Sequence, residues 1–283
     1  MMKVRTIEDI DYSNGFAVDD GRRHRQLDLF LPESDRPAPP IVVIHGGGWF
    51  TQGRKGARER NIATDLASAG FAAASIDYAL VNLDSPEKSH GLWPTPLSDC
   101  KMAVGFLRKH ADEYQIAPER AGAIGGSAGA HLAAMLGASS GNNSIDSAFG
   151  LDCTVQAVAY LYGVCDIGRW IANADEHRLG MDAAEIMLDG TPASNPEAYE
   201  SASPVCQISS QSAPMLLIHG KADAAIPYGE TEYFYNRAQE AGLESELILV
   251  PDAGHSFDLN PPSMDIKNRV ISFFHKHLAG EIG

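Results

Sequence analysis

Short uninterrupted runs of apolar residues alternate along most of the chain with segments whose apolar residues recur at helical spacing. An uninterrupted apolar run that ends at glycine or proline is typical of a strand buried on both faces. Alternation of such strands with helices predicts an α/β fold with a mostly parallel sheet and helices on both of its faces. The predicted strands are residues 25–31, 41–47, 71–78, 121–126, 155–163, 214–220 and 244–250.

The longer segments between these strands carry the helical pattern. In residues 97–114, apolar residues from Cys100 to Tyr114 recur every three or four positions and would share one face. The first strand is different, because residues 25–31 alternate in character and precede a proline-rich stretch, which predicts an antiparallel edge strand. The predicted helices are residues 56–69, 97–114, 128–138, 228–241 and 263–279.

One segment, residues 164–212, does not follow this alternation of strands and helices. It contains charged residues, Trp170 and Asn-Pro or Ser-Pro turns, and it has no clear long period. An excursion of this length from a compact domain is usually functional. We therefore predict one domain over residues 1–283, with a cap-like insertion at 164–212 that partly covers the site.

Composition narrows the range of partners. The chain has 283 residues, of which 44% are apolar and 21% charged, so it can bury a substantial core. Acidic residues number 37 against 22 lysines and arginines, which gives a net charge of −15. This excess argues against nucleic acid and against anionic membrane surfaces as partners. A neutral small molecule would not be repelled.

No run of apolar residues approaches membrane-spanning length, and the first residues have no pattern of a signal peptide, so a cytoplasmic protein is predicted. The four cysteines form no close pair and are expected to be buried free thiols. No HExxH, paired-cysteine or EF-hand pattern is present, so neither a metal nor another cofactor is expected.

The first chemical motif is GGSAG, residues 125–129, between a predicted strand and a predicted helix. A serine on a sharp strand-to-helix turn projects its hydroxyl out of the sheet, and small residues must flank it to avoid clashes. Such a pentapeptide alone is weak evidence in a glycine-rich chain, but its position between a strand and a helix strengthens it. Ser127 is therefore the predicted nucleophile.

The second motif is HGGGW, residues 45–49, directly after a predicted buried strand. Consecutive glycines let backbone N–H groups converge on one point, which is the requirement of an oxyanion hole. A phosphate-binding loop would show GK[ST] or GxGxxG, and neither is present.

A base and its orienting acid are expected further along the chain. His255 lies in AGHSF, between the last predicted strand and the last helix, and Asp223 lies just past the preceding strand. Loops at the carboxyl ends of parallel strands are where such sheets build their sites. His255 would take the serine proton, and Asp223 would hold the imidazole tautomer. Asp166 is the alternative acid, and His219 is expected to pack or to form hydrogen bonds.

Together these motifs resemble the α/β-hydrolase superfamily, and within it the bacterial carboxylesterases related to hormone-sensitive lipase and to feruloyl and acetyl-carbohydrate esterases. The resemblance covers roughly residues 25–280. It implies an eight-stranded, mostly parallel sheet and a serine carboxylesterase that works through an acyl-enzyme. It also implies oxyanion donors Gly47, Gly48 and Ala128, with the Trp49 amide as an alternative to Gly48.

The resemblance implies further that Tyr78 supports the glycine loop. The chain before HGGGW is short and strand-like, however, so the N-terminal helical cap of the hormone-sensitive-lipase group is not expected here. Small residues after Ser127 and the acidic composition favour short-chain acyl groups on a neutral or aromatic alcohol. The candidates for lining the substrate pocket are Trp49, Tyr78, Trp93 and Trp170.

Two other functions fit part of the same pattern. Arylformamidases and prolyl-oligopeptidase-like peptidases cleave amides with the same triad on this fold. A non-catalytic small-molecule binding protein on the same fold is the other alternative, against which the intact Ser127, Asp223 and His255 argue. The sequence also leaves a homodimer open.

Overall fold

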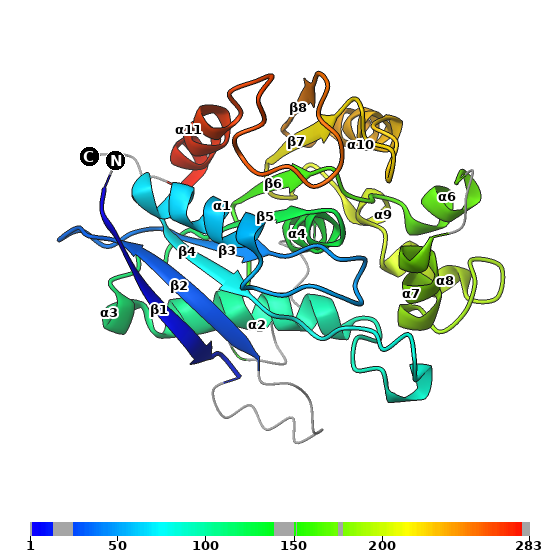
Figure 1. The fold of residues 1–283 in the computed structure, drawn as a ribbon, viewed down its shortest axis with the longest axis horizontal. Coiled ribbons are helices and arrows are strands. Elements are labelled where there is room, and N and C mark those ends of the chain that lie inside the picture. The colour runs from blue at the N-terminus through cyan, green and yellow to red at the C-terminus, as the bar shows by residue number, and fades with distance from the viewer. Residues whose placement is uncertain (1, 14–24, 139–149, 151, 175–177, 279–283) are drawn as a thin grey trace.

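The computed structural model describes residues 2–13, 25–138, 150, 152–174 and 178–278 (Figure 1). In this part of the chain, eight strands form one sheet in the order β1-β2-β4-β3-β5-β6-β7-β8. The strands are β1 (Val4–Asp11), β2 (Gln26–Pro32), β3 (Pro40–Ile44), β4 (Ala72–Ile76), β5 (Gly122–Gly126), β6 (Ala157–Leu161), β7 (Met215–Gly220) and β8 (Ser245–Val250). From β4 to β8 every pairing is parallel, and β1 and β2 are antiparallel. The predicted mostly parallel eight-stranded fold is confirmed.

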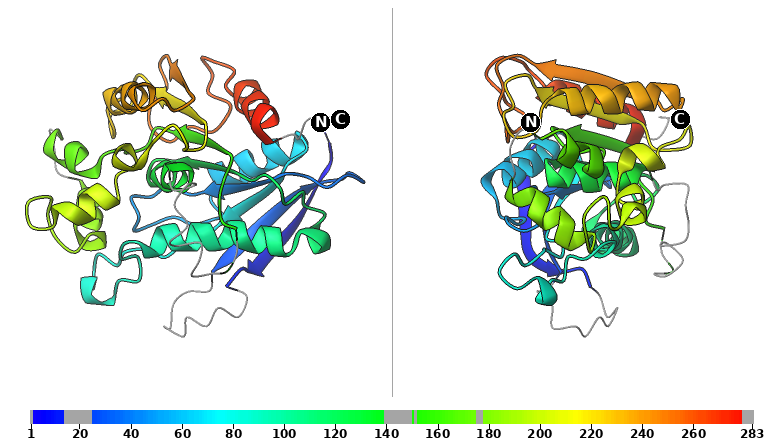
Figure 2. Two further views of the ribbon diagram at one scale, coloured as in Figure 1. Left: turned by 180° about the vertical axis from the view of Figure 1, so that it is seen from behind. Right: turned by 90° about the vertical axis from the view of Figure 1, so that its right-hand side faces the viewer.

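Helices lie on both faces of this sheet (Figures 1 and 2). One face packs against α2 (Thr95–Lys109), α4 (Ala128–Ala138) and α10 (Gly229–Glu240). The other face packs against α1 (Ala57–Ser68) and α11 (Lys267–Leu278). A short helix, α3 (Ala111–Tyr114), follows α2, so the predicted helix at 97–114 is interrupted at His110. The central strands β3 to β7 are buried along their whole length, as their uninterrupted apolar runs predict.

The sequence did not predict the first strand of the sheet. β1 pairs with β2 in antiparallel register, from Val4 opposite Pro32 to Asp11 opposite Gln26. Its side chains are exposed or half-buried, because it is an edge strand. Its residues, VRTIEDID, therefore include charged side chains on the solvent side and show no continuous apolar run.

In the described residues between β6 and β7, within the segment predicted as an insertion, there are four short helices. They are α6 (Ile167–Ala172), α7 (Leu179–Met187), α8 (Pro196–Ser201) and α9 (Pro204–Gln207). Buried apolar side chains from α6, α7 and α8 form a third cluster that also includes Trp49 from the glycine loop and Ala128 from the start of α4. The inserted helices are thus packed directly on the residues around Ser127.

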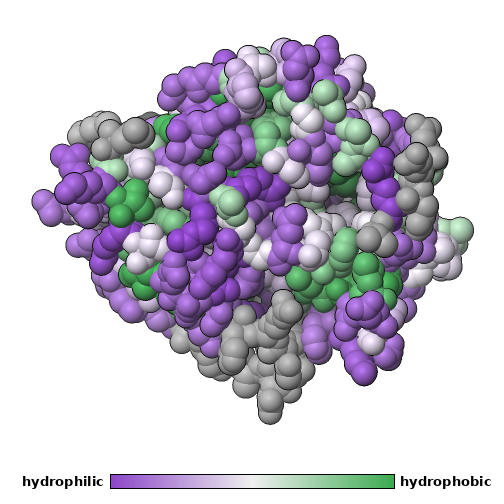
Figure 3. Space-filling view, viewed as in Figure 1, coloured by the Kyte–Doolittle hydropathy of each residue, from purple (hydrophilic) through white to green (hydrophobic). Residues whose placement is uncertain are grey.

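The surface is largely hydrophilic on the face shown in Figure 3, and hydrophobic residues gather toward the side where α7 lies. Among the described residues, no helix is both long and apolar enough to cross a bilayer. The four cysteines, which all lie in the described residues, form no disulfide. Cys100, Cys153 and Cys165 are buried as predicted, whereas Cys206 is exposed because it lies in the short surface helix α9.

Candidate active site

The GGSAG segment forms a tight turn between β5 and α4. Ser127 has a φ of 58°, in the left-handed region, which side chains adopt only where the surrounding structure enforces it. The glycines around Ser127 are required because a side chain at their positions would clash with neighbouring backbone atoms. A Cβ added to Gly129 would lie 2.1 Å from the carbonyl oxygen of Ile44, and one added to Gly125 would lie 2.3 Å from that of Gly129. The turn can therefore form only with glycine at both positions.

Three side chains that are far apart in sequence meet at this turn. The hydroxyl oxygen of Ser127 lies 3.1 Å from Nε2 of His255, and Nδ1 of His255 lies 2.7 Å from Oδ2 of Asp223. They follow β5, β8 and β7 respectively, at the carboxyl ends of the parallel strands, on the side of the molecule where α6 and α7 lie (Figure 1). The imidazole side chain is 22% exposed, so it is shielded but reachable from solvent.

The Asp223 carboxylate is fully buried and has four hydrogen-bond partners. Oδ1 accepts from the amides of Ala225 at 2.8 Å and Ile226 at 2.9 Å, and Oδ2 faces His255 and His219. Burial acts to raise the pKa of Asp223, but hydrogen bonds from the two histidines, the charge of His255 and the Ile226 amide together lower it well below its usual range. The carboxylate is therefore ionised at neutral pH.

The glycine loop contacts the nucleophile directly. A Cβ added to Gly46 would lie 3.2 Å from Cβ of Ser127. Gly47 and Gly48 have φ values of 92° and 59°. Within the described residues, the amides of Gly47, Gly48 and Ala128 donate to no other protein group. The backbone around Ser127 thus presents N–H groups that are not used by secondary structure.

A buried histidine, His131, connects the glycine loop to the inserted helices. The indole N–H of Trp49 donates to Nδ1 of His131 at 3.2 Å, and Nε2 of His131 donates to the Ala202 carbonyl at 2.6 Å. Burial lowers the pKa of His131 to about 4, which keeps the imidazole neutral and able to accept from Trp49. The sequence placed His131 only within a helix and gave no signal for this contact.

A tyrosine that sequence reasoning missed lies beside His255. Tyr162 directly follows β6, and its ring meets the His255 imidazole edge to face with 5.1 Å between centroids. Its hydroxyl donates to the carbonyl of Phe257 and accepts from Arg58 at 3.3 Å. Burial raises the pKa of Tyr162 to about 12, so it stays protonated as a donor. Tyr162 therefore fixes the loop that carries His255, a role visible only in three dimensions.

The four aromatic residues predicted to line a pocket have different surroundings. Trp49 is 1% exposed and meets Trp170, itself 6% exposed, at 6.2 Å between ring centroids. Tyr78 stacks on His45 at 4.2 Å and donates to the carbonyls of His45 and Gly46. Trp93 is half-buried beside the same cluster. Trp49 and Trp170 thus present little surface to a ligand and mainly shape the loop and its covering helices, whereas Tyr78 borders a cavity together with His45.

The alternative acid, Asp166, lies elsewhere. Its carboxylate caps the N-terminus of α6 by accepting from the amide of Arg169 at 2.9 Å. The contact to His255 is made by Asp223 instead. In the described part of the chain, no group of three or more histidine, cysteine or acidic side chains could hold a metal ion.

Comparison with known proteins finds esterases among the relatives of this chain. The chain is 28% identical to esterase LipQ of Mycobacterium tuberculosis, over 89% of this chain and 58% of the relative. It is 29% identical to esterase LipC of the same organism, over 79% of this chain and 54% of that protein. The chain therefore spans little more than half the length of these curated relatives.

Solved structures share the fold. A carbohydrate esterase from gut microbiota superposes with a TM-score of 0.80 at 23% identity, covering 98% of this chain and 97% of its own. The butyrate-bound esterase Est2 of Thermogutta terrifontis superposes with a TM-score of 0.72 at 22% identity, covering 97% and 94%.

The predicted resemblance to α/β-hydrolase carboxylesterases is thus confirmed. The BD-FAE family model matches residues 27–238, which is well over half of the sequence. This chain therefore has the α/β-hydrolase fold and belongs to the BD-FAE family.

Proposed function

We propose that this protein is a serine carboxylesterase in which Ser127 attacks the ester carbonyl. The observation that carries the proposal is the continuous line of contacts from Ser127 through His255 to Asp223, at 3.1 and 2.7 Å. The esterase names of the curated relatives support the same reaction class.

The proposed reaction consists of two acyl transfers. As Ser127 Oγ bonds to the ester carbonyl carbon, His255 Nε2 takes the hydroxyl proton and the carbonyl oxygen becomes an oxyanion. The C–O bond to the alcohol then breaks, and the alcohol leaves with the proton from His255. Water, deprotonated by the same imidazole, attacks the carbonyl carbon of the acyl-enzyme. The bond from this carbon to Ser127 Oγ breaks, His255 returns the proton to Oγ, and the acid leaves. Asp223 stays ionised and stabilises the imidazolium.

The oxyanion would be held by backbone amides. Gly47, Gly48 and Ala128 are the proposed donors, because they lie next in the chain to Gly46, which contacts Ser127, and to Ser127 itself, and their N–H groups have no other protein acceptor in the described structure. Donors fixed in place before reaction cost no reorganisation when the charge appears. Loss of one such donor lowers turnover on the order of a hundredfold in other hydrolases.

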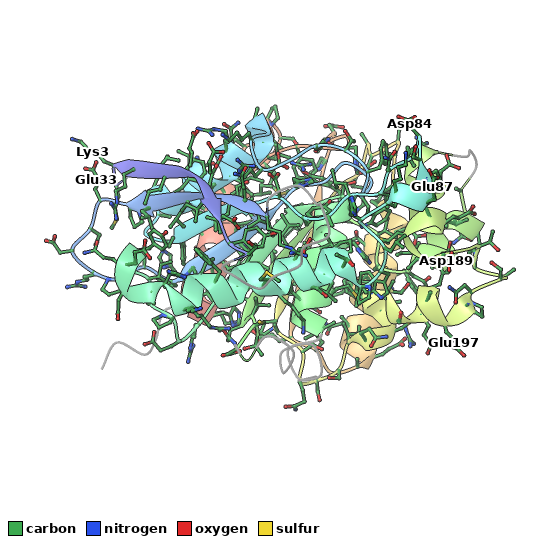
Figure 4. The ribbon with its side chains drawn as sticks, turned by 90° about the horizontal axis from the view of Figure 1, so that it is seen from below. Lys3, Glu33, Asp84, Glu87, Asp189 and Glu197 are labelled. Atoms are coloured by element: carbon green, nitrogen blue, oxygen red, sulfur yellow. The ribbon has the colours of Figure 1, made fainter. Side chains whose placement is uncertain are left out.

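The substrate we propose is a neutral ester with a short acyl chain. The inserted segment, residues 164–212, would act as a cap, since α7 reaches the glycine loop: a Cβ added to Gly48 would lie 3.3 Å from Cα of Gly180. A cap this close leaves little room for a long chain. Acidic side chains gather at this end of the molecule and would repel an anionic substrate. Those visible in Figure 4 are Asp84, Glu87, Asp189 and Glu197.

The test is hydrolysis of nitrophenyl esters of increasing acyl length. Ser127→Ala should abolish turnover of the acetate and butyrate esters. The matched control is Ser210→Ala, on an exposed turn, which should hydrolyse these esters as fast as the parent protein does. Activity should fall on the acid side of the pH profile, because a protonated imidazole cannot act as a base. Full activity of Ser127→Ala would overturn the proposal.

A further inference from the structure

A second histidine contacts the carboxylate of the triad. His219 is the second-to-last residue of β7, and its side chain is fully buried. Its Nε2 lies 3.0 Å from Oδ2 of Asp223, the same oxygen that faces Nδ1 of His255. Two imidazoles therefore share one carboxylate oxygen, and only one of them, His255, reaches the nucleophile.

The surroundings of His219 fix where its hydrogen lies. Nε2 faces two acceptors, the Asp223 carboxylate and the carbonyl of Ile226 at 2.9 Å, so this nitrogen must carry a hydrogen. Nδ1 lies 2.6 Å from the hydroxyl oxygen of Thr231, which is itself fully buried. A hydroxyl can satisfy Nδ1 by donating to it, so Thr231 holds the ring with its Nε2–H aimed at Asp223.

We propose that His219 is a positioning residue for the reaction, which holds the Asp223 carboxylate in the orientation that His255 requires. This inference rests on the function proposed above. With Oδ1 taken by the amides of Ala225 and Ile226, the bond from His219 to Oδ2 completes the set of contacts that prevents the carboxylate from rotating. His219 acts through Asp223 and touches neither substrate nor Ser127.

The same bond also sets how strongly Asp223 attracts the His255 proton. A hydrogen bond from His219 draws charge from the shared oxygen, so less charge is available to stabilise the His255 imidazolium. Without this donor, Oδ2 would bind the imidazolium more tightly. The acid side of the pH–rate profile would then move toward neutrality.

The experiment compares variants by kcat, KM and the pH dependence of kcat/KM. His219→Leu removes the donor, and His219→Gln restores an N–H group near the position of Nε2. Thr231→Val removes the orienting hydroxyl at nearly constant shape, so it tests the same bond if His219→Leu fails to fold. His275→Leu, in the exposed part of α11, is the control for loss of a histidine. Thermal unfolding verifies that each variant is folded.

The expected result is a loss of roughly tenfold in kcat for His219→Leu, since one hydrogen bond to a charged group is removed. KM should stay nearly constant, the acid limb should shift upward, and His219→Gln should recover most of the rate. Thr231→Val should shift the limb in the same direction by less. A folded His219→Leu or Thr231→Val protein with the parent kcat and an unmoved acid limb would overturn the inference.

The two proposals fail in different ways. If the acid limb does not move in the folded variants but Ser127→Ala is inactive, only the role of His219 is refuted. If Ser127→Ala is fully active, the proposed function itself is refuted.

Discussion

Protonation of His131 should destabilise the fold in mild acid. The imidazole is buried between Trp49 and Ala202, with one nitrogen accepting and the other donating. A proton on Nδ1 would make this nitrogen a donor, and it would then face another donor, the Trp49 N–H. The proton would also place an unpaired positive charge in the interior. Acid should therefore weaken the contact that joins the glycine loop to the inserted helices.

The magnitude follows from the difference between the folded and unfolded states. Burial lowers the pKa of His131 from 6.5 to about 4, so between these values the unfolded chain binds more protons than the folded one. The stability contribution is present above pH 6.5 and is lost as the pH falls toward about 4. One pKa unit corresponds to about 1.4 kcal/mol, so the loss is about 2 kcal/mol by about pH 5 and about 3 kcal/mol in full.

The measurement is the free energy of unfolding by urea at about pH 7.5 and about pH 5, for the parent protein and for His131→Gln. Glutamine can donate and accept in the same place but does not titrate, so the comparison removes contributions from carboxylates common to both proteins. The parent should lose about 2 kcal/mol more than His131→Gln between the two pH values. Equal losses in the two proteins would refute the reasoning.

Two further substitutions test the geometry around Ser127. Gly129→Ala would press a methyl group against the carbonyl oxygen of Ile44, so thermal unfolding should reveal a loss of stability of at least about 2 kcal/mol. The control is Gly229→Ala, which should leave the stability unchanged because no atom lies within 4 Å of the added carbon. Equal stability of the two variants would contradict this. Tyr162→Phe removes the hydroxyl that donates to the carbonyl of Phe257, so kcat should fall by roughly tenfold with little change in unfolding temperature. An unchanged kcat would show that this hydrogen bond does not position the base.

Much of the site could be predicted from sequence because its backbone requirements restrict residue type. Gly125 and Gly129 are required where the chain turns sharply around Ser127, and consecutive glycines are required in the loop that touches it. His255 and Asp223 follow strands, so an alternating pattern of strands and helices places them at one edge of the sheet.

Other features depend on contacts that no local pattern reveals. β1 is an edge strand with mixed side chains, so it lacks the apolar run that identified the buried strands. The contacts of His131, Tyr162 and His219 each join residues brought together only by the fold. Among the ten histidines, the sequence could identify the base by its place in the chain but could not show that His219 shares its carboxylate.

Covalent labelling tests most directly whether Ser127 is the residue that is acylated. The protein is incubated with a fluorophosphonate and digested, and the modified peptide is identified by mass spectrometry. We expect a single adduct on Ser127, formed at the rate at which ester hydrolysis is lost and absent from His255→Gln at matched times. Hydrolysis that persists in fully labelled protein, or an adduct on another residue that abolishes activity, would contradict this expectation.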